Sequence, residues 1–292
     1  MTTLKISDGL LKDEVLVLGL ASTNAKGGIA IESGDLAIDT KAILASLIEM
    51  GATGAADEVI KTPGSAVSMM VFTGLGKKTN SYSHETLRRA AGAASRALAG
   101  TNAATFSLSS TSPESIAAVA EGAALGAYVF SEFRGSSKAE HKAALKTITI
   151  YSKSASKPDA KAAIARAKII ADYTFLVRDL INTPPSHLTP DSFTKKLAVA
   201  FKAAGGLKAG LKITIWDEKQ LKSQGFGGII GVGQGSANPP RLLHISYTPK
   251  GAIKKRYAFI GKGITFDTGG LNLKPGLGME AMKSDMSGAA AV

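Results

Sequence analysis

Four charged residues lie close together near the end of this 292-residue chain. They are Lys262, Asp267, Lys274 and Asp285, and glycine-rich turns lie between them. Glycine lets the backbone turn sharply, so the pattern predicts charged side chains held in tight turns. A single Lys or Asp in a loop is usually an ordinary surface residue. Four of them, framed by an apolar run, turns and a helix, indicate a site where charged groups act together.

The elements around these residues predict how they are positioned. Residues 257–260 form a short apolar run, typical of a strand buried on both faces of a parallel sheet. The glycines at 261 and 263 then place Lys262 at the carboxyl end of that strand, the end at which open α/β sheets bind ligands. A helical pattern begins at about Met279, with Asp285 in its first turns.

Two segments, GKGITFDTGGLNLKP and MKSDMSGAAAV, resemble the metal-binding signature of the leucyl aminopeptidases, which are two-metal exopeptidases of the cytosol aminopeptidase family. This resemblance implies that Lys262 and Asp285 bind one metal ion and that Asp267 bridges two. It implies that Lys274 stays off the metals as a catalytic ammonium. The cofactors expected from it are two divalent ions, Mn²⁺ or Zn²⁺.

Physical chemistry is consistent with these implied roles. A lysine binds a metal only as the neutral amine, so the ion must suppress a pKa normally near ~10.4. Two close divalent ions lower the pKa of a shared water and polarise the scissile carbonyl. A fixed ammonium such as Lys274 stabilises the negative charge of the tetrahedral intermediate. Binding of the substrate's free α-amine to one metal would explain why only amino-terminal residues are removed.

The chain departs from the family pattern in one respect. The family signature continues with an Asn-Thr-Asp-Ala-Glu-Gly-Arg segment, and this sequence stops at Val292 before it. The resemblance assigns further metal carboxylates to that segment, and an arginine that holds bicarbonate. We therefore expect a fragment of a longer aminopeptidase, incomplete for activity by itself. The alternative is an inactive fragment or a module that binds nucleic acid or nucleotide.

Other motifs in the chain are weaker. Asp267-Thr268-Gly269 is the triplet of aspartic proteases, but Asp285-Met286-Ser287 does not repeat it and the chain is rich in helix. Residues 261–265 lack the glycine lead-in of a P-loop, and the glycine-rich residues 225–235 contain no full G-x-G-x-x-G. None of the four histidines is expected to be a ligand, and His244 is expected in the core of a strand.

The amino-acid composition limits the classes of protein to which this chain can belong. Hydrophobic residues at 45% and charged residues at 20% are typical of a soluble globular protein. The absence of cysteine excludes disulfides and fits a cytoplasmic location. No basic and apolar leader opens the sequence, and no apolar run approaches the ~18 residues of a membrane helix, so we expect no membrane contact.

The formal net charge of +12 would favour nucleic acid or another anionic partner. The lysines are spread among alanines, however, as on solvated helix faces, which makes nucleic acid the less favoured partner. The expected partners are peptide substrates and, by family resemblance, other copies of the chain in a homohexamer.

The fold class expected is α/β: an amino-terminal macro-like α/β domain, then the first part of a mixed-sheet two-metal catalytic domain. The proposed domains are residues 1–155, a linker helix at 156–181 and a catalytic part at 182–292. The first of these shows a βαβαβαβ order, which predicts an α/β sandwich; its resemblance to macro domains comes from the family. Ser83 is the expected N-cap of its second helix. The strands expected lie at residues 15–18, 67–73, 105–108, 145–151, 211–216 and 242–247, and the helices at 42–50, 84–98, 113–127 and 157–181.

Overall fold

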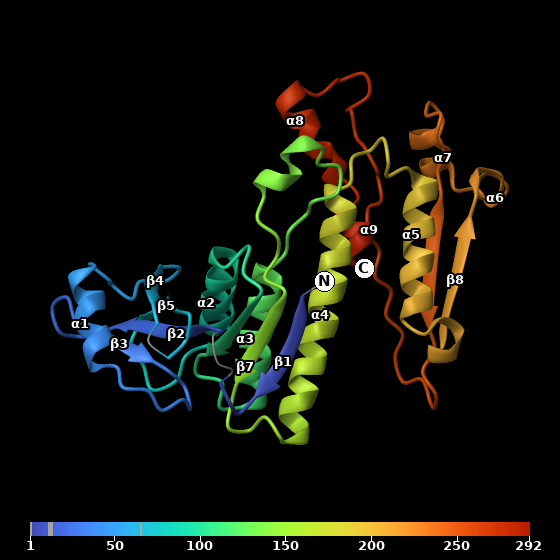
Figure 1. Ribbon diagram of the computed structural model, residues 1–292. Helices are drawn as coiled ribbons and strands as arrows, with labels where there is room; N and C mark the ends of the chain where they lie inside the picture. Colours follow the sequence, from blue (N-terminus) through green and yellow to red (C-terminus); the bar gives the residue numbers. More distant parts are fainter. Residues whose placement is uncertain (1, 11–13, 65) are drawn as a thin grey trace. The chain divides into compact units, whose positions relative to one another are not determined.

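The computed structural model describes residues 2–10, 14–64 and 66–292 (Figure 1). The chain divides into two compact units, Met1–Phe175 and Leu176–Val292, here called the amino-terminal and the carboxyl-terminal unit. The domain boundaries proposed at 155/156 and 181/182 stay predictions. None of the described helices has the length and apolar composition needed to cross a bilayer.

The amino-terminal unit is built on a seven-stranded mixed sheet in the order β1-β7-β6-β2-β5-β4, with β3 paired to β2. β3 and β4 are antiparallel to their neighbours, and the other pairs are parallel. The strands are β1 Thr3–Ser7, β2 Val15–Ser22, β3 Ile29–Glu32, β4 Val59–Pro63, β5 Met69–Lys77, β6 Ala103–Ser107 and β7 Thr147–Tyr151.

Strand β2 explains how this sheet is covered. Its residues Val15 and Val17 belong to one buried cluster, whereas Leu16 and Leu18 belong to another, because successive side chains point to opposite faces. The first cluster includes residues of α2, α3 and α4, and the second includes Leu47 of α1. Helices therefore cover both faces, as the run of apolar residues in β2 predicts. The helices are α1 Lys41–Glu49, α2 His84–Ala97, α3 Pro113–Gly126 and α4 Pro158–Asn182.

Local signals set the ends and the packing of these helices. The Ser83 hydroxyl accepts a hydrogen bond from the Thr86 N–H at 3.0 Å, which confirms Ser83 as the N-cap of α2. Helices α2 and α3 approach so closely that a Cβ on Gly122 would lie 2.0 Å from the Arg88 carbonyl oxygen. Near this contact the Arg88 guanidinium pairs with the Glu121 carboxylate at 3.0 Å.

The carboxyl-terminal unit has a smaller framework. Strands β8 (Leu211–Trp216) and β9 (Leu242–Tyr247) form a two-stranded antiparallel sheet. Its buried cluster consists of Leu180, Leu188, Phe193 and Met286. The helices of this unit are α5 Pro190–Ala203, α6 Glu218–Ser223, α7 Gly227–Gly233, α8 Gly276–Glu280 and α9 Ser287–Ala291, with short 3₁₀ helices at Gly206–Ala209 and Ala281–Ser284; a further 3₁₀ helix, Ser136–Glu140, lies in the amino-terminal unit.

The α/β class is confirmed, and the expected elements of the amino-terminal unit appear with end shifts of a few residues. Strands β1, β3 and β4 were not predicted. The strand predicted at residues 257–260 is wrong: this segment is irregular, and Phe259 and Ile260 are 79% and 93% exposed. The physical reason is that a strand needs a neighbour to take its backbone hydrogen bonds, and β8 and β9 pair only with each other.

Two further expectations need correction. The helix predicted from about Met279 is instead broken into α8, the 3₁₀ helix Ala281–Ser284 and α9, so Asp285 ends the 3₁₀ helix. His244 is exposed rather than in a core. Its ring stacks on Trp216 with centroids 6.1 Å apart.

Candidate metal centre

Lys262 and Asp285, 23 positions apart, form an ion pair in the carboxyl-terminal unit. The Lys262 Nζ donates a hydrogen bond to Asp285 Oδ1 at 2.8 Å and lies 2.7 Å from Oδ2. That second oxygen is buried and accepts no hydrogen bond from the described residues, despite the short distance. The side chain of Asp285 is 18% exposed, whereas that of Lys262 is 58% exposed. This carboxylate oxygen is thus removed from bulk water and faces the Lys262 ammonium.

Contacts on both sides of this pair hold it in place. The Ala289 N–H donates a hydrogen bond to the Lys262 carbonyl oxygen at 2.9 Å, which joins the Lys262 loop to helix α9. Met286, next to Asp285, is fully buried in the small core of the unit. The apolar anchor at 286 therefore fixes the backbone that carries the Asp285 carboxylate.

Asp267 and Lys274 form the second pair, within one loop. Lys274 Nζ lies 2.7 Å from Asp267 Oδ2, and the Lys274 N–H donates to the Thr268 carbonyl oxygen at 3.0 Å. The Gly269 N–H donates to Asp267 Oδ1 at 2.8 Å. Gly269 has a φ of 95°, in the left-handed region that favours glycine, so this loop geometry depends on Gly269.

The charges of Lys262 and Asp267 interact, and this links the two ion pairs. The hydrogen bond to Asp285 raises the pKa of Lys262 above its ordinary value, and the charge of Asp267 acts in the same direction. The hydrogen bond from Lys274, followed by that from the Gly269 N–H, lowers the pKa of Asp267, and the charge of Lys262 lowers it further. The interaction of Lys262 with Asp267 thus links the two pairs, so that each of the four sequence-predicted residues interacts with at least one other.

The donor set fits a divalent ion in part. Carboxylate oxygens and a neutral nitrogen are ordinary ligands of Mn²⁺ and Zn²⁺. The buried Oδ2 of Asp285, whose near partner is the Lys262 ammonium at 2.7 Å, would become available to an ion once that lysine loses its proton. Among the residues described, no three His, Cys, Asp or Glu side chains gather in a way that could hold a metal. The Lys262 nitrogen would thus have to act as a ligand, and further ligands would be needed to complete two coordination shells.

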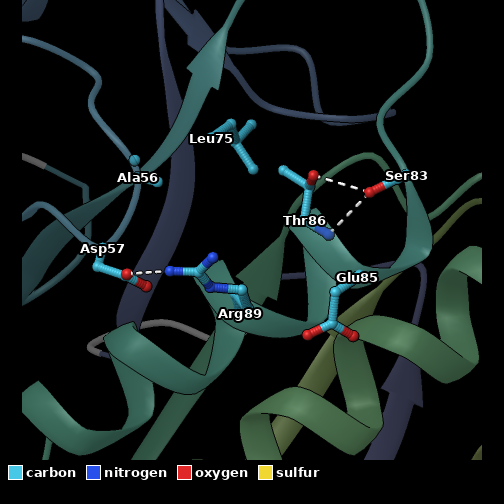
Figure 2. Close-up of a pocket in the computed structure, with 8 residues that line it drawn as sticks. Ala56, Asp57, Leu75, Ser83, Glu85, Thr86 and Arg89 are labelled. Carbon is cyan, nitrogen blue, oxygen red and sulfur yellow. Dashed lines mark hydrogen bonds and ion pairs between the residues drawn. The ribbon is translucent and has the colours of Figure 1, made fainter.

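The amino-terminal unit has a pocket of about 140 Å³ at the end of β5 and the start of α2 (Figure 2). Figure 2 shows Arg89 across the pocket, paired with Asp57, so its charge is already neutralised. Small-molecule sites usually occupy about 300–1,000 Å³. The nearby Gly74 and Gly76 N–H groups donate to the Glu58 and Gly54 carbonyl oxygens and are not free for a phosphate. This pocket gives no support to nucleotide binding.

Comparison with protein families identifies both units. Residues 17–137 match the N-terminal domain of the cytosol aminopeptidase family, and residues 175–292 match its catalytic domain. A probable cytosol aminopeptidase of Rhodococcus erythropolis is 41% identical over 285 residues, which cover 96% of this chain and 55% of the relative. One from Streptomyces griseus is 42% identical over 319 residues, covering 100% of this chain and 60% of the relative. The chain thus spans little more than half the length of these relatives.

Solved structures agree in fold. The bottromycin maturation enzyme BotP in complex with Mn superposes with a TM-score of 0.72 at 28% identity, covering 97% of this chain and 55% of that one. A mutant of tomato leucine aminopeptidase gives a TM-score of 0.76 at 22% identity, covering 100% of this chain and 58% of that one. At such low identity the second comparison speaks for the fold alone.

Proposed function

This chain belongs to the cytosol aminopeptidase family, and we propose that it forms part of a metal-dependent aminopeptidase that removes amino-terminal residues from peptides. The observation that supports this best is that the Lys262–Asp285 and Lys274–Asp267 ion pairs are linked by the interaction of Lys262 with Asp267. The finer features proposed are a preference for leucine and similar residues, two divalent ions and a cytoplasmic location.

Three side chains of the cluster would hold the metal ions. We assign Lys262 and Asp285 to one ion and Asp267 to a position between two. The buried Oδ2 of Asp285, 2.7 Å from Lys262 Nζ, supports this assignment, and BotP, a structural relative, was solved with Mn. When bound, the ions would supply Lewis-acid polarisation of the carbonyl and an activated water. Mn²⁺ or Zn²⁺ would satisfy a mixed nitrogen and oxygen donor set.

Metal binding at Lys262 is coupled to proton release. The hydrogen bond to Asp285 raises the pKa of Lys262, so the metal-free side chain carries its proton at neutral pH. A nitrogen that carries this proton has no lone pair for a metal. Binding must therefore displace both the proton and the ion pair, and it should become tighter as the pH rises.

Lys274 has a separate role as the catalytic ammonium. Its Nζ is aligned by the Asp267 carboxylate at 2.7 Å and by the Asp267 carbonyl oxygen at 3.3 Å. A positive charge held this way requires little reorganisation when negative charge develops on a peptide carbonyl oxygen. Lys274 would stabilise that oxygen in the tetrahedral intermediate. Bicarbonate, further carboxylate ligands and a homohexameric assembly belong to the proposal for the complete enzyme and rest on the family alone.

The direct test is hydrolysis of a chromogenic leucine amide by the complete enzyme of which this chain is proposed to form part, after dialysis against MnCl₂ or ZnCl₂, with the alanine amide measured in parallel. We expect Asp285→Asn and Lys274→Ala to lose activity, and Lys250→Ala, at an exposed lysine of the same unit, to keep it. Equal loss in all three variants, or activity that survives a chelator, would refute the metal-dependent proposal.

One feature keeps a polyanion-binding role as the alternative. Residues 176–292 contain sixteen Lys and Arg but only seven Asp and Glu, so most of the net positive charge lies in the carboxyl-terminal unit. Such an excess attracts nucleic acid in a salt-dependent way. Retention of DNA that falls steeply with salt, in a chain that hydrolyses no leucine amide, would favour this alternative.

A further inference from the structure

The two backbone segments that carry Lys262 and Asp285 touch each other through glycines. A Cβ added to Gly261 would lie 2.3 Å from the Gly288 carbonyl oxygen and 2.5 Å from the Ala289 nitrogen. A Cβ added to Gly288 would lie 3.1 Å from the Lys262 nitrogen. The atoms met in each case are backbone atoms, so they cannot swing away as the end of a flexible side chain can.

Neither glycine is needed for an unusual backbone conformation, since neither is among the residues with positive φ. This distinguishes Gly261 and Gly288 from Gly269, whose φ is 95°. Close approach of the two segments is therefore the reason for having no side chain at these two positions. The hydrogen bond from the Ala289 N–H to the Lys262 carbonyl oxygen, at 2.9 Å, sets the register of the contact.

This contact lies directly beside both members of the ion pair. Lys262 follows Gly261, and Asp285 is three residues before Gly288. The buried Met286 lies between Asp285 and the contact and anchors that side of it. A change in the Gly261–Gly288 separation would thus be transmitted to the distance between the Lys262 nitrogen and the Asp285 oxygens.

We propose that Gly261 and Gly288 are positioning residues of the metal site, and that their backbone contact sets the spacing of Lys262 and Asp285 for one shared divalent ion. The inference rests on the proposed function, because it assumes that these side chains bind the metal. Metal–ligand distances tolerate changes of only about 0.2 Å. A Cβ at position 261 would require the segments to separate by several tenths of an ångström, which is more than this tolerance.

Neighbouring glycines provide a graded set of substitutions. A Cβ on Gly263 would meet only the Ala289 Cβ, at 3.3 Å, and a Cβ on Gly278 in α8 would meet nothing within 4 Å. The expected order of loss in metal affinity is therefore Gly261→Ala, then Gly288→Ala, then Gly263→Ala. Gly278→Ala is the matched control, since it makes the same chemical change in the same unit without a steric contact.

The experiment is a titration of the full metal-free chain with MnCl₂, following free Mn²⁺ by electron paramagnetic resonance. We expect Gly261→Ala to weaken binding by about 10- to 100-fold, the range for losing a group that supports a metal ligand. Gly288→Ala should weaken it several-fold, and Gly278→Ala should bind as the wild type does. Each variant is titrated well below its unfolding temperature, measured by circular dichroism, so that only folded protein is compared.

The outcomes separate this inference from the proposed function. Wild-type protein that binds no Mn²⁺ would overturn the proposed function and this inference with it. Wild-type protein that binds Mn²⁺, with Gly261→Ala and Gly288→Ala both equal to Gly278→Ala, would overturn the inference alone. If Gly261→Ala does not fold, the comparison of Gly288→Ala with Gly278→Ala decides the question in the same way.

Discussion

The two units of this chain differ in the size of their buried cores and in where the candidate site lies. The amino-terminal unit buries residues on both faces of a seven-stranded sheet, with Phe72 and Phe106 fully enclosed. The carboxyl-terminal unit has a two-stranded sheet and a buried cluster of four residues, yet it holds all four charged residues of the candidate site. The unit with the smaller framework is therefore the one that carries the proposed site.

This difference indicates how each unit should respond to change. In the amino-terminal unit many buried contacts contribute to stability together, so a substitution there should alter stability without changing the proposed metal site. In the carboxyl-terminal unit a few contacts, among them Gly261 with Gly288 and the anchor at Met286, determine the geometry of the site. Small shifts there should change metal affinity and activity more than they change stability.

The largest expected effect is on stability in the amino-terminal unit. Phe106 is fully buried, so Phe106→Ala should lower the free energy of unfolding by about 3–5 kcal/mol. Phe259 is 79% exposed, so the same substitution there should cost almost nothing. Urea unfolding followed by circular dichroism compares the two, and fluorescence of Trp216, the single tryptophan, reports on the carboxyl-terminal unit. A large loss in Phe259→Ala would mean that residues 257–260 are buried after all.

The next effect is on catalysis. Lys274→Ala should lower kcat for a leucine amide by about 10²- to 10³-fold, as expected for loss of one group that stabilises the oxyanion. Mn²⁺ affinity should not fall, because Lys274 is not assigned as a ligand. Assays of kcat and of Mn²⁺ binding on the same preparations test this. A parallel fall in metal affinity would mean that Lys274 belongs to the metal shell.

A third substitution sharpens the contrast between the units through a second close glycine contact. Gly122→Ala places a Cβ 2.0 Å from the Arg88 carbonyl oxygen, where α2 and α3 meet, and should cost about 1–3 kcal/mol of stability. Its Mn²⁺ affinity should equal that of the wild type, whereas Gly261→Ala should show the opposite pattern. Denaturant midpoints and Mn²⁺ titrations of both variants measure this. A loss of Mn²⁺ affinity in Gly122→Ala would contradict the claim that substitutions in the amino-terminal unit leave the proposed metal site unchanged.

The smallest effect is a dependence of stability on pH. The hydrogen bond from Lys195 lowers the pKa of Asp191 below its ordinary value, with Arg241 acting in the same direction. A carboxylate with a depressed pKa stabilises the fold above its unfolded pKa, and this contribution is lost as the pH falls through the folded value. Asp191→Asn should therefore slightly lower the urea midpoint of unfolding, followed by Trp216 fluorescence, at pH 7. The difference in midpoint between variant and wild type should disappear in acid. A difference in midpoint between variant and wild type that grows in acid would contradict the lowered pKa of Asp191.

Local signals in the sequence predict much of the amino-terminal unit. Ser83 marks the start of α2 because a hydroxyl caps the free N–H groups there, and this needs no distant partner. Strand β2 is recognisable because burial on both faces makes it continuously apolar. By contrast, β3 has four residues and β4 ends at a proline, so neither shows enough pattern to be read as a strand.

The error at residues 257–260 has a non-local cause. Their apolar pattern is typical of a strand, but a strand exists only where a neighbour accepts its hydrogen bonds, and the sequence of a segment does not report its neighbours. The candidate site shows the same limit. Family resemblance identified Lys262, Asp267, Lys274 and Asp285, and their roles as ligands and catalyst stay predictions. The burial of Asp285 Oδ2 beside Lys262 and the Gly261–Gly288 contact depend on folding in three dimensions, and no local pattern predicts them.

The most direct measurement is anomalous diffraction at the manganese edge from crystals of the full chain grown with MnCl₂. The account predicts an anomalous peak within bonding distance of Lys262 Nζ and an Asp285 carboxylate oxygen, with a second peak beside Asp267. Lys274 should contact neither peak. Crystals of Mn²⁺-loaded protein with no peak at these atoms, and with the Lys262–Asp285 ion pair intact, would contradict it.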